Sequence, residues 1–269
     1  TRREPWNDAE MRWAINYALP KQEIGDATTG GQGIVSAYNF PLYPALQSWL
    51  EENQDLIDQY NPTEYNPDKA REIFESKGYV MGANGFYEKD GQPLQVDVLF
   101  KTEEPILPAI IIQAFQDVGI DAAPRALAGA AYFDARDTAD FDIETHHVAC
   151  GSVVEPYDEL RLLHSRWIMP EGERSSLNQW GWSNAEYDEI VDQMQMLEPG
   201  AEEQHELFRR ALEIRLQELP IISLTQQQRV VPYTTRYWTN WPTAENDYHH
   251  PPNWWMNFLM LVVNIEPAS

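Results

Sequence analysis

A single cysteine, Cys150, occurs in the 269 residues of this chain. One thiol forms no internal disulfide and builds no cysteine-based zinc site, so a disulfide-stapled fold is excluded. No uninterrupted apolar run reaches the roughly 18 residues that a membrane-spanning helix needs. The cluster Gly30-Gly31-Gln32-Gly33 follows no predicted strand, so it lacks the context of a nucleotide-binding loop.

Basic residues are scarce as well. The chain has 19 Lys and Arg against 43 Asp and Glu, which gives a net charge of -24. Nucleic-acid-binding proteins need a basic face, and anionic lipid repels an acidic surface, so neither partner is predicted. The hydrophobic content of 43% and the aromatic content of 12% are typical of a globular protein. The first residues, TRREPWNDAEMRW, contain no apolar signal-peptide segment.

Helical periodicity begins near the amino terminus. Asn7 and Glu10 have the spacing of a capping box, with an apolar stripe behind them. Residues 25–45 are rich in Gly, Thr, Tyr and Pro and are predicted to form a loop. Further helices are predicted over residues 46–60 and 67–76.

The middle of the chain alternates strands and helices. Asp90-Gly91 is a strong hairpin-turn signal, and the alternation of Leu94, Val96 and Val98 behind it predicts a strand. The elements predicted beyond it are a helix over residues 106–118, a strand over 120–127, a helix over 132–138, a strand over 141–149, helices over 184–197 and 201–219, and strands over 221–225 and 229–233. This order predicts an α/β lobe.

The sequence gives little support for a metal site or for a catalytic nucleophile. Adjacent side chains such as His146 and His147 point to opposite faces of a strand, so the two seldom bind one metal ion. Cys150 lies along the same predicted strand, whereas a catalytic thiol needs a base brought to it in space. Carboxylates are so numerous that no pair stands out as a glycosidase acid and base. We therefore predict no metal site, no cofactor and no catalysis.

The ten tryptophans are the most informative feature. Trp167, Trp180 and Trp182 lie in the polar stretch SRWIMPEGERSSLNQWGWSN, where Asn178 and Gln179 supply amides. A flat indole ring beside amides suits a ligand that has one apolar face and many hydroxyls, as a sugar does. The alternative is that some of these rings pack the interior, and about half of the ten are expected to do so.

Six segments, in order, resemble the family 5 extracellular solute-binding proteins of ABC importers, whose members bind peptides, nickel or oligosaccharides. They are PWNDAEMRWAINYALPKQEI, YNPDKAREIFESKGY, GFYEKDGQPLQVDVLF, FQDVGIDA, WSNAEYDEIVDQ and ELPIISLTQQQRVV. Together they cover about residues 5–235. The first of them resembles the segment that opens the carboxyl-terminal lobe in that family.

The resemblance implies an α/β fold with a mixed sheet flanked by helices: the carboxyl-terminal lobe of a periplasmic-binding-protein-like fold, type II, of the large class. Residues 1–235 would form the ligand-binding lobe, and residues 236–269 a tail returning toward an amino-terminal lobe outside this chain. A non-enzymatic receptor is implied, with permease subunits of an ABC transporter as partners. Its place would be periplasmic or extracytoplasmic, with membrane contact only through the permease or a lipid anchor of the full-length protein.

The resemblance also bears on the ligand. Where peptide-binding members carry an aspartate, this chain has Gly151 or Ser152, which leaves a peptide amine without its partner. The tail YWTNWPTAEN resembles the oligosaccharide-binding branch. We therefore expect an oligosaccharide, with an oligopeptide as the alternative and a glycoside hydrolase as the rival class. The predicted ligand-binding residues are Trp180, Trp182, Trp167, Asn178, Gln179, His146, His147, Ser152, Trp238, Asn240 and Trp241.

Overall fold

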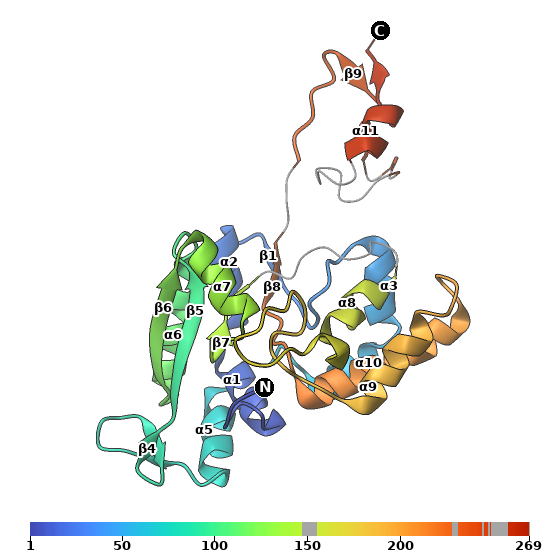
Figure 1. Ribbon diagram of the computed structural model, residues 1–269. Coiled ribbons are helices and arrows are strands. Elements are labelled where there is room, and N and C mark those ends of the chain that lie inside the picture. Colours follow the sequence, from blue (N-terminus) through green and yellow to red (C-terminus); the bar gives the residue numbers. More distant parts are fainter. Residues whose placement is uncertain (147–154, 228–230, 244, 247, 249–257, 269) are drawn as a thin grey trace. The chain divides into compact units, whose positions relative to one another are not determined.

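The computed structural model describes residues 1–146, 155–227, 231–243, 245, 246, 248 and 258–268 (Figure 1). The chain divides into two compact units, Thr1–Gln227 and Gln228–Ser269, called unit 1 and unit 2 below. The sequence predicted a boundary near residue 235 on functional grounds, and the return of the tail to a second lobe stays a prediction.

The elements of unit 1 are as follows. Its helices are α1 (Ala9–Ala18), α2 (Lys21–Thr29), α3 (Pro44–Glu51), α4 (Gln54–Tyr60), α5 (Pro67–Ser76), α6 (Ile106–Asp117), α7 (Gly129–Asp137), α8 (Tyr157–Leu160), α9 (Ala185–Met194) and α10 (Glu202–Glu218), with short 3-10 turns at Arg161–Leu163 and Ser165–Trp167. Its strands are β1 (Gly33–Val35), β2 (Val80–Met81), β3 (Tyr87–Lys89), β4 (Gln92–Pro93), β5 (Gln95–Lys101), β6 (Asp121–Leu127), β7 (Ile143–Glu144) and β8 (Thr225–Gln227).

A three-stranded parallel sheet in the order β6-β5-β7 organises unit 1, and β5 and β6 run side by side over their full length (Figure 1). Helix α6 connects β5 to β6, and α7 connects β6 to β7 on the far side of β5. Because parallel crossovers are right-handed and the two connections run in opposite directions, the helices cover opposite faces of the sheet. Alternation along β5 agrees, since Val98 joins one core cluster and Leu99 another.

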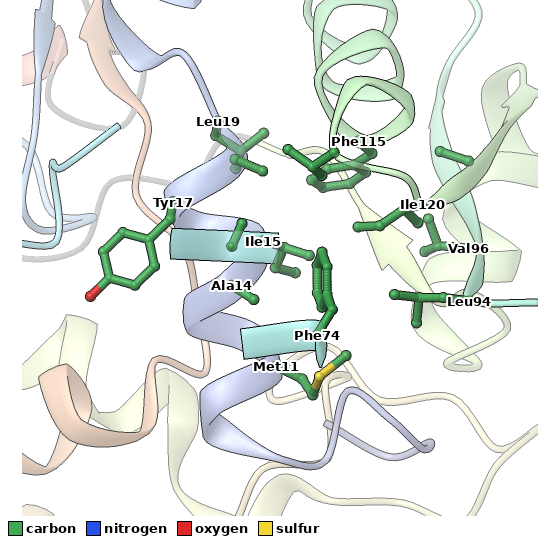
Figure 2. Close-up of a cluster of buried hydrophobic side chains, with 14 of the residues drawn as sticks. Met11, Ala14, Ile15, Tyr17, Leu19, Phe74, Leu94, Val96, Phe115 and Ile120 are labelled. Atoms are coloured by element: carbon green, nitrogen blue, oxygen red, sulfur yellow. The ribbon is translucent and has the colours of Figure 1, made fainter. Parts of the chain in front are cut away.

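Three hydrophobic clusters stabilise unit 1. Figure 2 shows the first, in which Met11, Ile15 and Leu19 of α1 pack with Phe74 of α5 and Phe115 of α6. The second joins α9 and α10 to α3 and the segment around Phe40, and the third lies between β5 and α7. Burial of these side chains at about 25 cal/mol per Å² is the main source of stability.

Unit 1 also contains two small antiparallel sheets. The predicted hairpin forms as β3 and β4 around Asp90-Gly91, both with positive φ, and β2 pairs with the outer side of β3. Strand β1 pairs with β8, so that Gly33 faces Gln227 across nearly two hundred residues of chain. In unit 2, β9 (Trp238–Thr239) pairs antiparallel with β10 (Glu266–Pro267), and α11 (Phe258–Asn264) precedes β10.

Several predicted elements differ from the observed ones. The first helix is capped by Asp8, whose side chain accepts from the backbone N–H of Glu10, and not by Asn7. The predicted loop contains α2 and β1, and the predicted helix over residues 46–60 is split into α3 and α4 at Asn53. The strand expected over residues 221–225 is β8, which begins only at Thr225.

Candidate functional site

A cavity of about 670 Å³ lies within unit 1. Its lining includes residues of the segment 139–146, which contains the edge strand β7, and of the segment 219–226. The loop 103–107 after β5 and the amino-terminal residues Thr1, Arg2, Arg3 and Trp6 close it further. A cavity of this volume is in the range that binds small ligands.

The position of the cavity follows from the strand order. The chain leaves β5 in one direction to reach β6 and returns past β5 to form β7, so the winding reverses between β5 and β7. In open α/β sheets, ligands bind outside the carboxyl ends of strands at such a reversal. Glu103 and Glu104 follow β5, and Thr145 and His146 follow β7, and all four line the cavity.

The lining mixes apolar, polar and charged side chains. Its charged members are Arg2, Arg3, Arg12, Glu103, Glu104, Asp142 and Glu144. The whole chain carries a charge of -24. The cavity lining, by contrast, has three guanidinium groups and four carboxylates, so its positive and negative charges nearly cancel. Such a wall favours a neutral or dipolar ligand over one of high charge.

Part of this charge already has partners in the protein. Arg12 donates to the backbone oxygens of Glu218 and Trp6 at 2.8 and 2.9 Å. Arg3 is paired with Asp142 at 3.2 Å. The second carboxylate oxygen of Asp142 accepts from the backbone N–H of Asp97 at 3.1 Å. These groups hold the sheet and the amino-terminal segment together.

Trp180 and Gln179 are predicted ligand-binding residues that line the cavity. Trp180 is partly buried and packs against the second and third hydrophobic clusters, so its ring is held in place. Gln179 donates from its amide to the backbone oxygen of Ser175 at 3.1 Å. Both residues thus belong to the cavity lining, but Gln179 is 5% exposed and its amide already has a partner in the protein.

Trp182 and Asn178 lie elsewhere, contrary to the expectation. Trp182 is 3% exposed in the second cluster, where its ring meets Tyr187 edge-on at 4.9 Å and its Nε1 donates to Glu218. Asn178 is fully buried, and its amide donates to the backbone oxygens of Leu163 and Trp182, both at 2.8 Å. Both residues stabilise the lobe and line no part of the cavity.

Of the remaining predicted ligand-binding residues of unit 1, one lies at the cavity and the others do not or are not described. His146 lines the cavity, with Nδ1 3.8 Å from Glu144 and Nε2 3.5 Å from Arg136. Trp167 is partly buried outside the cavity lining and donates to the backbone oxygen of Arg161 at 3.1 Å. His147 and Ser152 lie outside the described residues.

Trp238, Asn240 and Trp241 belong to unit 2. The ring of Trp241 stacks on Tyr233 at 4.8 Å, and its Nε1 donates to the backbone oxygen of Trp238 at 3.0 Å. Asn240 has a positive φ and donates to the backbone oxygen of Asn264 at 2.6 Å. Their part in ligand binding stays a prediction.

Glu144 is a cavity residue that the sequence analysis missed. It ends β7, its side chain is 2% exposed, and its Oε1 accepts from the hydroxyl of Tyr132. Burial raises the pKa of Glu144, and the Tyr132 hydrogen bond, Arg136 and Lys101 oppose that rise. Its place at the carboxyl end of a predicted parallel strand was the signal that could have pointed to it.

In the part of the chain that is described, no three His, Cys, Asp or Glu side chains come together as metal ligands would. Nor does any described helix have the length and apolarity needed to cross a membrane.

Comparison with known proteins now assigns the family. The model for bacterial extracellular solute-binding proteins, family 5 Middle, matches residues 1–163, more than half of the chain. The chain belongs to this family, and the predicted resemblance is confirmed.

Two curated relatives match shorter stretches. The nickel-binding periplasmic protein of Escherichia coli (strain K12) is 29% identical over 126 residues, 45% of this chain and 22% of the relative. Heme-binding protein A of Haemophilus influenzae is 35% identical over 82 residues, 30% of this chain and 13% of the relative. The chain therefore spans only a minor part of each.

Solved structures confirm the predicted periplasmic-binding-protein fold. A mannohexaose-bound periplasmic oligopeptide-binding protein of Thermotoga maritima matches with a TM-score of 0.82 and 20% identity, over 98% of this chain and 50% of that one. The oligopeptide-binding protein AppA of Bacillus subtilis, in complex with a nonapeptide, matches with a TM-score of 0.65 and 17% identity, over 84% of this chain and 43% of that one.

Proposed function

We propose that this chain is part of the substrate-binding component of an ABC importer and that it binds a neutral oligosaccharide. The observation that carries the proposal is that Trp180, which is only partly buried, lines the cavity together with polar neighbours such as Gln179. An indole face covers the apolar face of a sugar ring, while amides and hydroxyls bond to its edge. The mannohexaose bound by the Thermotoga neighbour is consistent with this ligand class.

The mechanism would be capture and release without covalent chemistry. A hydrolase needs two carboxyl groups, one acid and one base or nucleophile, free to act across a glycosidic bond. Asp142, the cavity carboxylate nearest in sequence to Glu144, is instead engaged by Arg3 and by the backbone of Asp97. This engagement favours a receptor over a glycoside hydrolase.

Partners and location follow from the same proposal. The family name describes extracellular solute-binding proteins, which fits delivery of the solute to permease subunits of an ABC transporter. A periplasmic or extracytoplasmic place for the full-length protein fits as well. A second lobe would then supply the facing wall and enclose the ligand on closure.

An oligopeptide is the second candidate, and one feature of the cavity favours it. Strand β7 pairs with β5 on one side, no described strand pairs with its other side, and both of its residues line the cavity. An extended peptide could add to such an edge through main-chain hydrogen bonds. The nonapeptide bound by the Bacillus neighbour is of this class.

Tryptophan fluorescence of the full-length protein tests the proposal. Mannohexaose, a β-linked glucose disaccharide and a series of di- to pentapeptides would be titrated in turn. We expect a saturable change with a saccharide. A saturable change with peptides alone would establish the second candidate, and release of reducing ends would establish a hydrolase.

A matched pair of variants locates the site. We expect Trp180→Ala to weaken saccharide binding about tenfold, since an aromatic contact contributes about 1–2 kcal/mol. Trp182→Phe should keep the affinity of the wild type and lower the midpoint of thermal unfolding, because its ring is in the core. The reverse pattern would place the ligand elsewhere.

A further inference from the structure

Glu144 combines three properties found in no other residue discussed above. It is a carboxylate, its side chain is 2% exposed, and it lines the cavity. Carboxylates are seldom buried unless another group compensates them. The groups around the carboxylate therefore indicate what kind of ligand group could form a hydrogen bond with it.

The partners of Glu144 engage only one of its two oxygens. The Tyr132 hydroxyl donates to Oε1, and His146 Nδ1 lies 3.8 Å from the same atom. Among the described residues, no hydrogen bond to Oε2 occurs. An acceptor atom of a buried carboxyl group thus remains for a ligand in the cavity.

The cations near Glu144 have carboxylate partners of their own. Lys101 Nζ lies 3.6 Å from Glu104, and Arg136 Nη2 lies 2.7 Å from Asp137. Lys101 also lies over the ring of Tyr132, 5.3 Å from its centroid. These cations lower the cost of burying Glu144 without forming an ion pair with it. The effect of burial on the pKa is larger than theirs, so the pKa of Glu144 is raised.

Tyr132 and Trp180 meet the same hydrophobic cluster. The Tyr132 ring is fully buried in the third cluster, against which Trp180 packs. The tyrosine that donates to Glu144 and the indole thus share one cluster, and Glu144 and Trp180 line the same cavity. A ring that stacks on Trp180 would have its edge hydroxyls available to a nearby acceptor.

We propose that Glu144 anchors the ligand by accepting hydrogen bonds at Oε2 from the hydroxyls of a carbohydrate whose ring lies against Trp180. This inference rests on the proposed function and names the residue that determines the ligand class.

A hydroxyl suits this carboxyl group better than an amine does. An ammonium group pairs most strongly with an ionised carboxylate, and burial raises the cost of ionising Glu144. A hydroxyl both donates and accepts, so it bonds to the carboxyl group in either protonation state. Glu144 can therefore bond to a neutral ligand rich in hydroxyls whether or not the carboxyl group carries its proton.

The test compares Glu144→Gln and Glu144→Met in the full-length protein, titrated with mannohexaose and with the β-linked glucose disaccharide. The amide of Gln keeps an acceptor and adds a donor, so we expect affinity within about fivefold of the wild type. Met keeps the length and removes the polar atoms, so we expect a loss of about 10–100-fold, the equivalent of one or two hydrogen bonds.

Controls separate binding from folding. Glu72→Gln and Glu72→Met change an exposed carboxylate on α5, outside the cavity lining, and should leave affinity unchanged. Monodeoxy derivatives of the disaccharide give a second measurement that is independent of folding. Removal of the hydroxyl that bonds to Glu144 should weaken binding to the wild type and have no further effect in Glu144→Met.

The titration results distinguish failure of the proposed function from failure of the role proposed for Glu144. If no saccharide binds the wild type, the proposed function fails. If saccharides bind and Glu144→Met binds them equally well, only the role of Glu144 is overturned. If peptides bind and Glu144→Gln weakens them more than about fiftyfold, the carboxylate pairs with an amine, which overturns the assignment to hydroxyls.

Discussion

Trp180 and Trp182 are separated by one glycine, yet their rings lie in different surroundings. Gly181 has a φ of +66°, and a Cβ there would lie 2.5 Å from the side chain of Arg2. The left-handed turn that glycine permits directs Trp182 into the core, while Trp180 remains at the cavity. The sequence identified the stretch, but it contained no signal of which ring faces a ligand.

Lys21 is a lysine whose ammonium group is buried. It is 2% exposed, and its Nζ donates to Asn16 Oδ1 at 2.7 Å and to the backbone oxygen of Pro62. Burial lowers its pKa to about 7 from 10.5. The ammonium group therefore has neutral acceptors and no carboxylate partner in the contacts described.

This environment predicts a pH-dependent stability. Below pH 7, Lys21 is charged in both the folded and unfolded states, and the folded state bears the full cost of a buried charge. Between pH 7 and 10.5 the unfolded state binds more protons, so the free energy of unfolding rises with pH by up to about 1.4 kcal/mol per unit.

Urea denaturation of the wild type and Lys21→Met at pH 7 and pH 9.5 measures this contribution. From pH 7 to pH 9.5, the free energy of unfolding of the wild type should rise by about 3 kcal/mol relative to that of Lys21→Met. A difference that is the same at both pH values would show that Lys21 titrates normally.

At the scale of elements, side-chain contacts account for the predictions that were wrong. The helix predicted over residues 46–60 is interrupted because Asn53 donates to the backbone oxygen of Trp49 at 2.8 Å and accepts from Arg209 at 3.1 Å. Helix α2 extends from Lys21 into the predicted loop over residues 25–45, and it is held in place by Ile24, which is buried in the first cluster. Tertiary packing overrides local propensity in both places.

Helix α9 shows the opposite case, in which the local signal was sufficient. Asn184 was predicted as its cap, and its side chain accepts from the backbone N–H of Tyr187 at 3.0 Å. Its amide also donates at 2.7 Å to Glu218, which accepts from Trp182 as well. The cap thus joins α9 to α10.

Replacement of Asn184 is expected to lower the stability of the protein by a measurable amount. Asn184→Ala should lower the free energy of unfolding by about 1–2 kcal/mol, because a helix N–H loses its acceptor. Asn184→Ser keeps an acceptor for that N–H and should recover at least half of the loss. Equal stability of the Ala and Ser variants would show that the cap contributes little.

At the scale of the whole molecule, the three hydrophobic clusters draw all their residues from unit 1. None of them includes a residue from the described part of the segment after Gln227. A unit with its own core should fold without the rest of the chain.

A shortened chain that ends at Gln227 tests this independence. It should unfold in one cooperative transition, with a midpoint within about 5 °C of the intact chain, because no cluster is removed. Loss of cooperativity by circular dichroism would show that residues 228–269 contribute to the core of unit 1.

The sequence by itself determined the family, the α/β order of elements and the features that depend on neighbouring residues. The hairpin turn at Asp90-Gly91 and the cap at Asn184 are examples, because each depends on backbone groups a few residues away. The observed α5, over Pro67–Ser76, likewise agrees with its predicted range.

Only the tertiary structure decided which side chains surround the cavity. Its walls come from residues 1–6, 103–107, 139–146 and 219–226, segments that no local pattern relates to one another. Glu144 is an example, because its hydrogen bond from Tyr132 of α7 and the burial of its side chain at the cavity both depend on the fold. Burial is set by contacts between distant segments, so it arises only once the chain has folded.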